Sequence, residues 1–153
     1  MKRLIVIVGA TAALALSASA FASPQSASAC VPGVKKLNGV PARTFCGPAK
    51  ATVHINGKTV SYRGGECTKS SFGWSINIGT VVLGNLRQKP EYFGITAKAS
   101  AGTQGNGAVA VVHAGKSLAV TQSAIKLAAG LKSGTFSGKV FGAPTRVSGS
   151  FTC

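Results

Sequence analysis

Apolar and polar side chains alternate on both sides of Asn56-Gly57, and this alternation is the strongest structural signal in the chain. An Asn-Gly pair between two alternating runs is typical of a two-residue type I′ β-hairpin. In that register Val53 lies opposite Val60. One predicted face carries Ala51, Val53, Ile55, Val60 and Tyr62, and the other carries Thr52, His54, Thr59, Ser61 and Arg63. A shift by one residue would mix the two sets, so the pattern specifies the register.

The two-residue period of apolar side chains recurs through most of the remaining chain. Phe72, Trp74, Ile76 and Ile78 share one face of a predicted third strand, and we expect Trp74 to pack in the core. Further strands or apolar runs are predicted at residues 79–86, 93–99, 108–112, 118–121, 135–141 and 146–153. Turns are predicted at residues 88–90, 113–116 and 142–144 and at the Gly-rich stretch 101–107. This succession predicts a mainly β domain, either an antiparallel β-sandwich or a barrel-like sheet.

Residues 123–131 fit two kinds of secondary structure. A helix would place Ala124, Leu127, Ala128 and Leu131 on one face. A strand would place Ile125, Leu127, Ala129 and Leu131 on one face. We favour the strand because Gly130 weakens a helix, and a short helix is the alternative.

The two ends of the chain differ in composition from the β region. Residues 1–29 are typical of a secretory signal peptide, with Lys2 and Arg3 before an apolar run and small-x-small cleavage sites ending at Ala20 and Ala29. Residues 30–49 form a Pro/Gly-punctuated arm with little periodicity, which we expect to lie over the sheet. Residues 50–153 are then the single exported β domain.

Four cysteines follow the signal segment, and their even number in an exported chain favours disulfides over metal binding or catalysis. Three pairings are arithmetically possible. A β-bulge at Gly64-Gly65 would turn Cys67 inward, toward the apolar face that also carries Cys153. The hypothesis that follows joins Cys67 to Cys153 and, within the arm, Cys30 to Cys46.

The chain is strongly basic, with 17 Lys and Arg against two acids and a formal net charge of +15. Removal of Lys2 and Arg3 with the signal peptide lowers this charge to +13. Such a domain is attracted to phospholipid head groups and anionic wall polymers, although a basic surface also simply maintains solubility. No basic run alternates with aromatic residues, so we expect no specific nucleic-acid binding.

The sequence contains few residues that could carry out chemistry. Glu66 and Glu91 are its only acids, and we interpret Glu91 as a surface charge and Glu66 as a partner for a nearby Lys or Arg. His54 falls on the polar face of the hairpin, and His113 lies at a strand end. Because no nucleophile, metal, phosphate-loop or dinucleotide motif is present, we predict neither enzyme activity nor a cofactor or metal.

Several motifs resemble the mycobacterial lipoprotein antigen family, the LpqH-like secreted antigens. They are INGK at residues 55–58, Cys67, the strand 74–78 with Gly79, GTQGNG at 102–107 and SGSFTC at 148–153. The resemblance covers about two thirds of the chain, from residue 50 to residue 153. It implies an extracytoplasmic, non-enzymatic envelope protein in which Cys67 pairs with Cys153.

We therefore expect a monomeric exported protein, extracellular or associated with the cell envelope, with an interaction or surface role. The alternative is a basic binding module for an anionic envelope polymer or lipid. We expect no lipid anchor at Cys30, because about a dozen residues separate it from Leu16 at the end of the apolar run, and ordinary cleavage sites lie between them. The sequence identifies no partner protein.

Overall fold

The computed structural model describes residues 30–153, so the predicted signal peptide and its cleavage sites lie outside the described residues. The described chain contains ten β-strands and one short 3₁₀ turn, and no α-helix occurs within it. The strands are β1 (Gly33–Leu37), β2 (Val40–Phe45), β3 (Ala49–Ile55), β4 (Lys58–Ser70), β5 (Gly73–Val82), β6 (Tyr92–Ala97), β7 (Gly102–His113), β8 (Lys116–Leu127), β9 (Ser133–Val140) and β10 (Arg146–Thr152).

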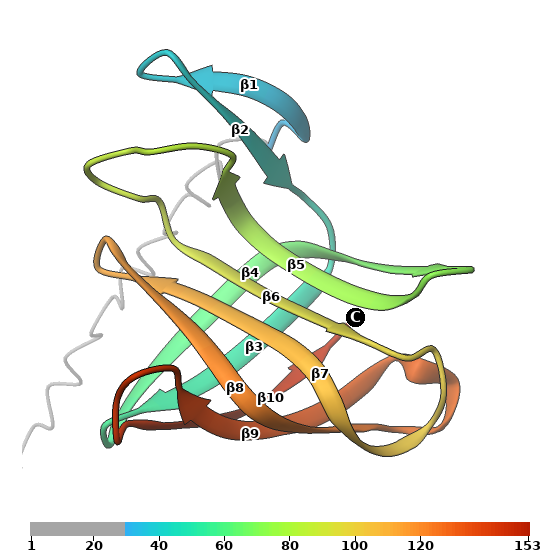
Figure 1. The fold of residues 1–153 in the computed structure, drawn as a ribbon. Helices are drawn as coiled ribbons and strands as arrows, with labels where there is room; N and C mark the ends of the chain where they lie inside the picture. Colours follow the sequence, from blue (N-terminus) through green and yellow to red (C-terminus); the bar gives the residue numbers. More distant parts are fainter. Residues whose placement is uncertain (1–29) are drawn as a thin grey trace, which may run out of the picture.

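Strands β3 to β10 form a closed eight-stranded antiparallel barrel (Figure 1). Each of these strands pairs with the next one along the chain, and β10 closes the barrel by pairing with β3. Of the two predicted architectures, the barrel-like sheet is therefore the one formed. Closure leaves none of these eight strands as a free edge on which another chain could pair.

The hairpin at Asn56-Gly57 has the predicted register, with Val53 opposite Val60 and Ile55 opposite Lys58. The φ angles of Asn56 and Gly57 are both positive, at 49° and 75°, as a type I′ turn requires. Val53 is fully buried inside the barrel, so the predicted apolar face is the inward one.

The bulge predicted at Gly64-Gly65 is present. Ala49 pairs with Gly65 whereas Lys50 pairs with Arg63, so Gly64 is the extra residue, with φ of +82°. The phase of β4 shifts there by one residue, as a bulge requires. The structure contains the predicted disulfides, which join Cys67 to Cys153 and Cys30 to Cys46.

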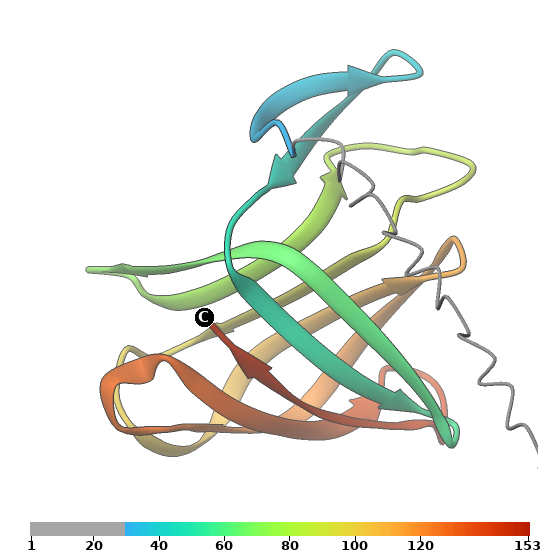
Figure 2. The same cartoon turned by 180° about the vertical axis from the view of Figure 1, so that it is seen from behind.

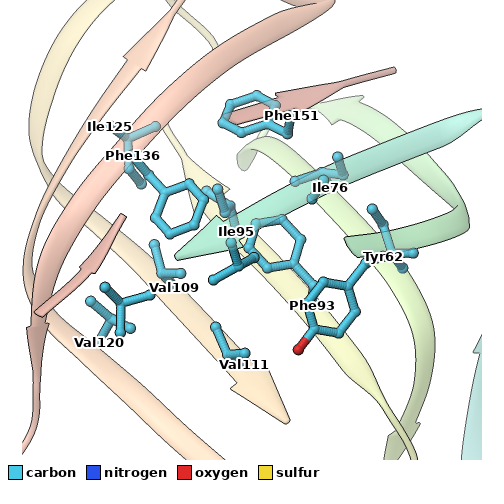
Figure 3. Packing of buried hydrophobic residues seen from close by; sticks show 14 of the residues in the cluster. Tyr62, Ile76, Phe93, Ile95, Val109, Val111, Val120, Ile125, Phe136 and Phe151 are labelled. Atoms are coloured by element: carbon cyan, nitrogen blue, oxygen red, sulfur yellow. The ribbon is translucent and has the colours of Figure 1, made fainter. Parts of the chain in front are cut away.

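The inside of the barrel is filled by side chains from all around its wall (Figure 3). The rings of Phe93 and Phe136 lie 5.3 Å apart, and the ring of Tyr62 lies 5.7 Å from that of Phe93. Near the Cys67–Cys153 disulfide, Trp74 packs on Phe151 of the terminal strand at 5.3 Å. An eight-stranded barrel has an interior of about the width that such side chains fill.

The N-terminal arm differs from the prediction. It folds as the β1–β2 hairpin, which stands above the barrel in Figure 1 instead of lying over the sheet. Its turn is Asn38-Gly39, with positive φ at both residues. Strand β2 extends the pairing of β5, from Phe45 opposite Gly79 to Ala42 opposite Val82, beyond the barrel.

Two further local predictions are wrong. Phe72 is 98% exposed, because Ser70 pairs with Gly73 and leaves Phe72 in the two-residue loop between β4 and β5. The stretch Gly102–Gly107 is not a turn but the first half of β7. The turn precedes it, and the side-chain amide of Gln104 stabilises this turn by accepting from the Lys98 N–H at 2.8 Å and donating to the Lys98 carbonyl at 2.9 Å.

The ambiguous stretch 123–131 is resolved largely as a strand. Ile125 and Leu127 are buried on the inner face of β8, as the strand interpretation predicted. The chain then leaves the sheet and forms the 3₁₀ turn Ala129–Leu131, where Gly130 has φ of +81°.

Candidate anion-binding surface

The two acids of the chain each have a cationic or polar partner. Glu66 on β4 lies 3.6 Å from the guanidinium of Arg43 on β2, as predicted for this residue, and the Arg43 guanidinium also lies 4.9 Å from the Phe45 ring centre. Glu66 therefore joins the barrel to the outer hairpin.

Glu91 was predicted to be a surface charge, and its half-exposed side chain also makes two polar contacts. Its Oε2 lies 3.0 Å from Nδ1 of His113, and its Oε1 accepts a 2.8 Å hydrogen bond from the Ala114 N–H. The side chains of Glu91 and His113 are about half exposed. They connect the β5–β6 loop with the β7–β8 turn, and this arrangement fits a structural contact between two loops.

The phenol groups inside and beside the barrel are also used structurally. Burial raises the pKa of Tyr62 strongly, and the negative charge of Glu91 adds to this shift. The Tyr62 hydroxyl donates a 3.1 Å hydrogen bond to the Val112 carbonyl. Burial likewise raises the pKa of Tyr92, whose hydroxyl donates to Oδ1 of Asn77 at 2.7 Å. Both phenols thus remain neutral hydrogen-bond donors.

Hydroxyl side chains cover the outer surface of four adjacent strands, and we call this surface the hydroxyl face. The strands are β4, β3, β10 and β9, which are neighbours in the sheet; Figure 2 looks onto the first three of them. The face comprises Thr52, His54, Thr59, Ser61, Ser133, Thr135, Ser137, Ser148, Ser150 and Thr152.

The hydroxyls form rows across the strands because the strands pair in register. One row runs from Ser61 through Thr52 and Ser150 to Thr135. Neighbouring hydroxyls in a row are about 4.8 Å apart at the backbone, and successive rows are about 6.8 Å apart, which are the spacings of a β-sheet. The hydroxyl face thus offers a regular array of hydrogen-bond donors and acceptors.

A second row contains His54. Its Nδ1 lies 3.0 Å from the hydroxyl of Thr59, its cross-strand neighbour, and Ser148 is its neighbour on the other side. The ring is exposed, in agreement with the solvated histidine expected from the sequence.

A shallow groove lies on the hydroxyl face over β9 and β10. It has a volume of about 440 Å³, and its polar lining comprises Lys126, Ser133, Thr135, Ser150 and Thr152. Lys126, from β8, is opposite Thr135 in the sheet. An ammonium group therefore borders a groove lined by four hydroxyls.

Basic side chains stand at both ends of the hydroxyl face. Lys50 and Arg63 lie at the end near the bulge, and Lys139 and Arg146 lie at the end near the β9–β10 turn. Glu66 lies on β4 beyond the bulge, where its carboxylate is 3.6 Å from the guanidinium of Arg43 on β2, and Glu91 contacts the β7–β8 turn. The hydroxyl rows and the four basic residues at their ends therefore include no acid.

One other hollow of the molecule is too small for most ligands. An apolar hollow where β5 leaves the barrel has about 220 Å³, below the roughly 300 Å³ at which small-molecule pockets begin. Within the described residues, no group of three or more His, Cys, Asp or Glu side chains is placed to hold a metal ion. Among residues 30–153, no helix has the length and apolar character to cross a membrane.

The sequence showed the components of the hydroxyl face but not the face itself. The alternation of Arg146, Ser148, Ser150 and Thr152 already placed these residues on one polar side of the last strand. What the sequence did not show is that β10 lies between β3 and β9, which brings three sets of hydroxyls together.

Comparisons with protein-family models, with curated protein sequences and with solved structures find no match to this chain. The resemblance to the LpqH-like antigens therefore remains a prediction from the sequence motifs.

Proposed function

We propose that this chain is an exported, non-enzymatic binding module that attaches to anionic polymers or lipids of the cell envelope. The observation that supports this proposal best is the hydroxyl face, which has basic residues at both ends and no acid. The two acids contact Arg43, His113 and Ala114, and neither is paired with a basic residue of this face.

The two disulfides indicate an oxidising location, outside the cell or in its envelope, because cytosolic thiols are kept reduced. Anionic phospholipids and wall polymers are abundant there, and a basic domain is drawn to them electrostatically. The sequence resemblance to envelope antigens points to the same location, and the surface role it implies is consistent with a binding module.

We propose that the chain has no lipid anchor. A lipoprotein carries its diacylglycerol on the sulfur of a cysteine, whereas the sulfur of Cys30 is bonded to Cys46. Detergent phase partitioning of protein expressed in its own host tests this, and the aqueous phase is expected. Recovery in the detergent phase after a wash in high salt would show that Cys30 is acylated.

The proposed function predicts binding that depends on salt. Retention on an anionic matrix and on native envelope fractions should fall steeply as salt rises, because mobile ions screen surface charges within a Debye length of about 8 Å at 0.15 M. A neutral matrix of the same material is the control. Absence of retention at low salt, or retention that salt does not change, would contradict the proposal.

A further inference from the structure

Each end of the hydroxyl face carries two like-charged residues directly opposite one another on adjacent strands. Lys50 is the partner of Arg63 across β3 and β4, and Lys139 is the partner of Arg146 across β9 and β10. Side chains opposite one another in an antiparallel pair have Cβ atoms about 5 Å apart, and like charges in these positions destabilise the sheet. The chain therefore places four cations where they oppose folding.

No ion pair of residues 30–153 offsets this repulsion. The contacts between acidic and basic side chains within the described residues are Arg43–Glu66 and His113–Glu91, and neither includes a member of the two like-charge pairs. Glu66 and Glu91 are the only acids of the chain, so its side chains supply no further anion. An anion from outside is the partner that would turn both repulsive pairs into attractive sites.

The two like-charge pairs are too far apart for one small anion. Val147 pairs with Ile55, so Arg146 lies level with residue 56, six residues along β3 from Lys50. At about 3.4 Å per residue this separation is about 20 Å. A ligand that contacts both pairs must be an extended molecule with negative charge at intervals along it.

The surface between the pairs favours phosphate groups. It consists of serine and threonine hydroxyls and His54, and the groove beside Lys126 lies at its side over β9 and β10, toward the end of Lys50. Hydroxyl, ammonium and guanidinium groups are the side chains that bind phosphate oxygens. The exposed large apolar residues are Val31, Val34, Phe72, Leu83 and Phe141. None of them lies in the hydroxyl rows, where the imidazole of His54 is the one ring, so the rows lack both a series of aromatic rings on which successive nucleic-acid bases stack and apolar groups that enter a bilayer.

We propose that the hydroxyl face binds a linear phosphate-bearing polymer, with phosphates seated at both like-charge pairs and intervening phosphates held by the hydroxyl rows and Lys126. This inference rests on the proposed function and specifies its ligand as a phosphate polymer of the envelope. The fixed separation of the two pairs makes binding bivalent, so long polymers gain affinity from simultaneous contact.

Inorganic polyphosphate is the probe for this site, with tripolyphosphate as the short analogue and polyglutamate as the carboxylate analogue. Calorimetry at constant salt should show that the wild-type protein binds long polyphosphate at least about tenfold more tightly than tripolyphosphate at equal phosphate concentration. It should bind polyglutamate of matched charge more weakly. Equal affinity for polyphosphate and polyglutamate would overturn the assignment to phosphate, as would stronger binding to phosphatidylglycerol vesicles.

A matched pair of variants tests the location. The double substitution Lys50→Gln and Lys139→Gln removes one charge from each like-charge pair, and Lys35→Gln with Lys98→Gln removes the same charge elsewhere. The first variant should lose the advantage of long over short polyphosphate, whereas the second should keep it. The first should also unfold at a higher temperature than the wild type when no ligand is present, because a like-charge repulsion is relieved in each pair. Equal effects of the two variants on binding would overturn the site.

The contribution of the hydroxyls can be tested without a change of charge. Thr135→Val, Ser150→Ala and Thr152→Val together should weaken polyphosphate binding by about tenfold or more, since hydrogen bonds to charged groups are lost. Thr96→Val with Thr103→Val, on exposed positions of β6 and β7, is the control and should bind as the wild type does. Unchanged binding by the triple variant would overturn the role of the hydroxyls.

If the wild type binds none of the polyanions, the proposed function itself fails. This result is distinct from equal binding by all variants, which would overturn only the site.

Discussion

The barrel and the outer hairpin contain the same local features, an Asn-Gly turn and a disulfide, but only the barrel encloses a core. Each has an Asn-Gly turn with positive φ at both residues and each is tied by a disulfide. The barrel disulfide joins residues 86 apart in sequence, and the hairpin disulfide joins residues 16 apart. The barrel encloses a core, whereas four of the five residues of β1 are exposed to solvent.

This difference shows that turns and disulfides set the path of the chain, while burial supplies most of the stability. The hairpin buries little more than Ala42 and Phe45, both of β2. Its other attachments to the barrel are the pairing of β2 with the end of β5 and the contact between Arg43 and Glu66. We therefore expect the barrel to unfold as one unit, and the hairpin to open more easily than the barrel.

The largest expected effect comes from removal of the barrel disulfide. The double substitution Cys67→Ala and Cys153→Ala should lower the free energy of unfolding by about 4–5 kcal/mol, because the bridge closes a long loop in the unfolded chain. Equilibrium denaturation of the variant and of the wild type measures this difference. A loss below about 2 kcal/mol would fall short of the chain-entropy estimate and point to residual structure in the unfolded state.

Trp74 and Phe72 are both aromatic and lie close together in the sequence, but only Trp74 is buried. Substitution of each one therefore tests how much stability comes from burial and not from hydrophobic character alone. Trp74 is 2% exposed and Phe72 is 98% exposed. Trp74→Ala should cost about 3–5 kcal/mol because it leaves a cavity against Phe151. Phe72→Ala should change stability by less than about 0.5 kcal/mol, as surface substitutions usually do. Equal denaturation midpoints for the two variants would contradict the assigned register of the β4–β5 turn.

Much of the barrel could be predicted because alternation reports which side chains face inward. The register at Val53 and Val60 and the bulge at Gly64 follow from local patterns of apolar residues and glycines. Phe72 was misplaced because the alternation continues for one step into a turn that contains neither Asn nor Gly. The Gly-rich start of β7 was missed because its glycines and polar side chains leave no hydrophobic pattern.

The outer hairpin and the hydroxyl face were harder to predict for physical reasons. Strand β1 has no buried face, so it shows no alternation, and its Asn38-Gly39 turn lies among Pro and Gly residues typical of loops. The hydroxyl face depends on the pairing of β10 with β3, which are far apart in sequence. Each residue of a like-charge pair looks like an ordinary surface residue in the sequence. The repulsion between the two residues becomes visible only when the cross-strand register is known.

The buried Tyr62 and the half-buried Tyr92 give a smaller effect that depends on pH. Burial raises the pKa of Tyr62 above its usual value, so the folded state keeps a proton that the unfolded state loses near pH 10. The unfolded state binds fewer protons there, and stability must fall as the pH rises above about 10. Tyr62→Phe should cost about 1 kcal/mol at neutral pH, through loss of the bond to Val112, and should flatten the alkaline decline.

A matched variant at Tyr92 compares the effect of pH near the outer hairpin with its effect in the barrel core. Tyr92, whose pKa burial also raises, lies outside the core cluster and packs against Phe45 of the hairpin at 6.2 Å between ring centres. Tyr92→Phe should flatten the alkaline decline less than Tyr62→Phe does, because the shift at Tyr62 is the larger one. Denaturation midpoints measured between about pH 8 and pH 11 report both effects. Parallel curves for the wild type and both variants would show that neither phenol is responsible for the decline.

The smallest effect on global stability is expected from removal of the hairpin disulfide. The chain-entropy estimate for a loop of 16 residues is about 3 kcal/mol. If the barrel unfolds separately from the hairpin, this free energy stabilises only the hairpin against opening. Cys30→Ala with Cys46→Ala should therefore change the global unfolding free energy by less than about 0.5 kcal/mol. Hydrogen exchange should become faster in β1 and β2 and remain unchanged in β3 to β10, whereas the variant without Cys67 and Cys153 should exchange faster throughout the barrel. A global loss as large as that caused by removal of the barrel disulfide would mean that the hairpin and the barrel unfold together, because β2 would then support the end of β5 that it extends.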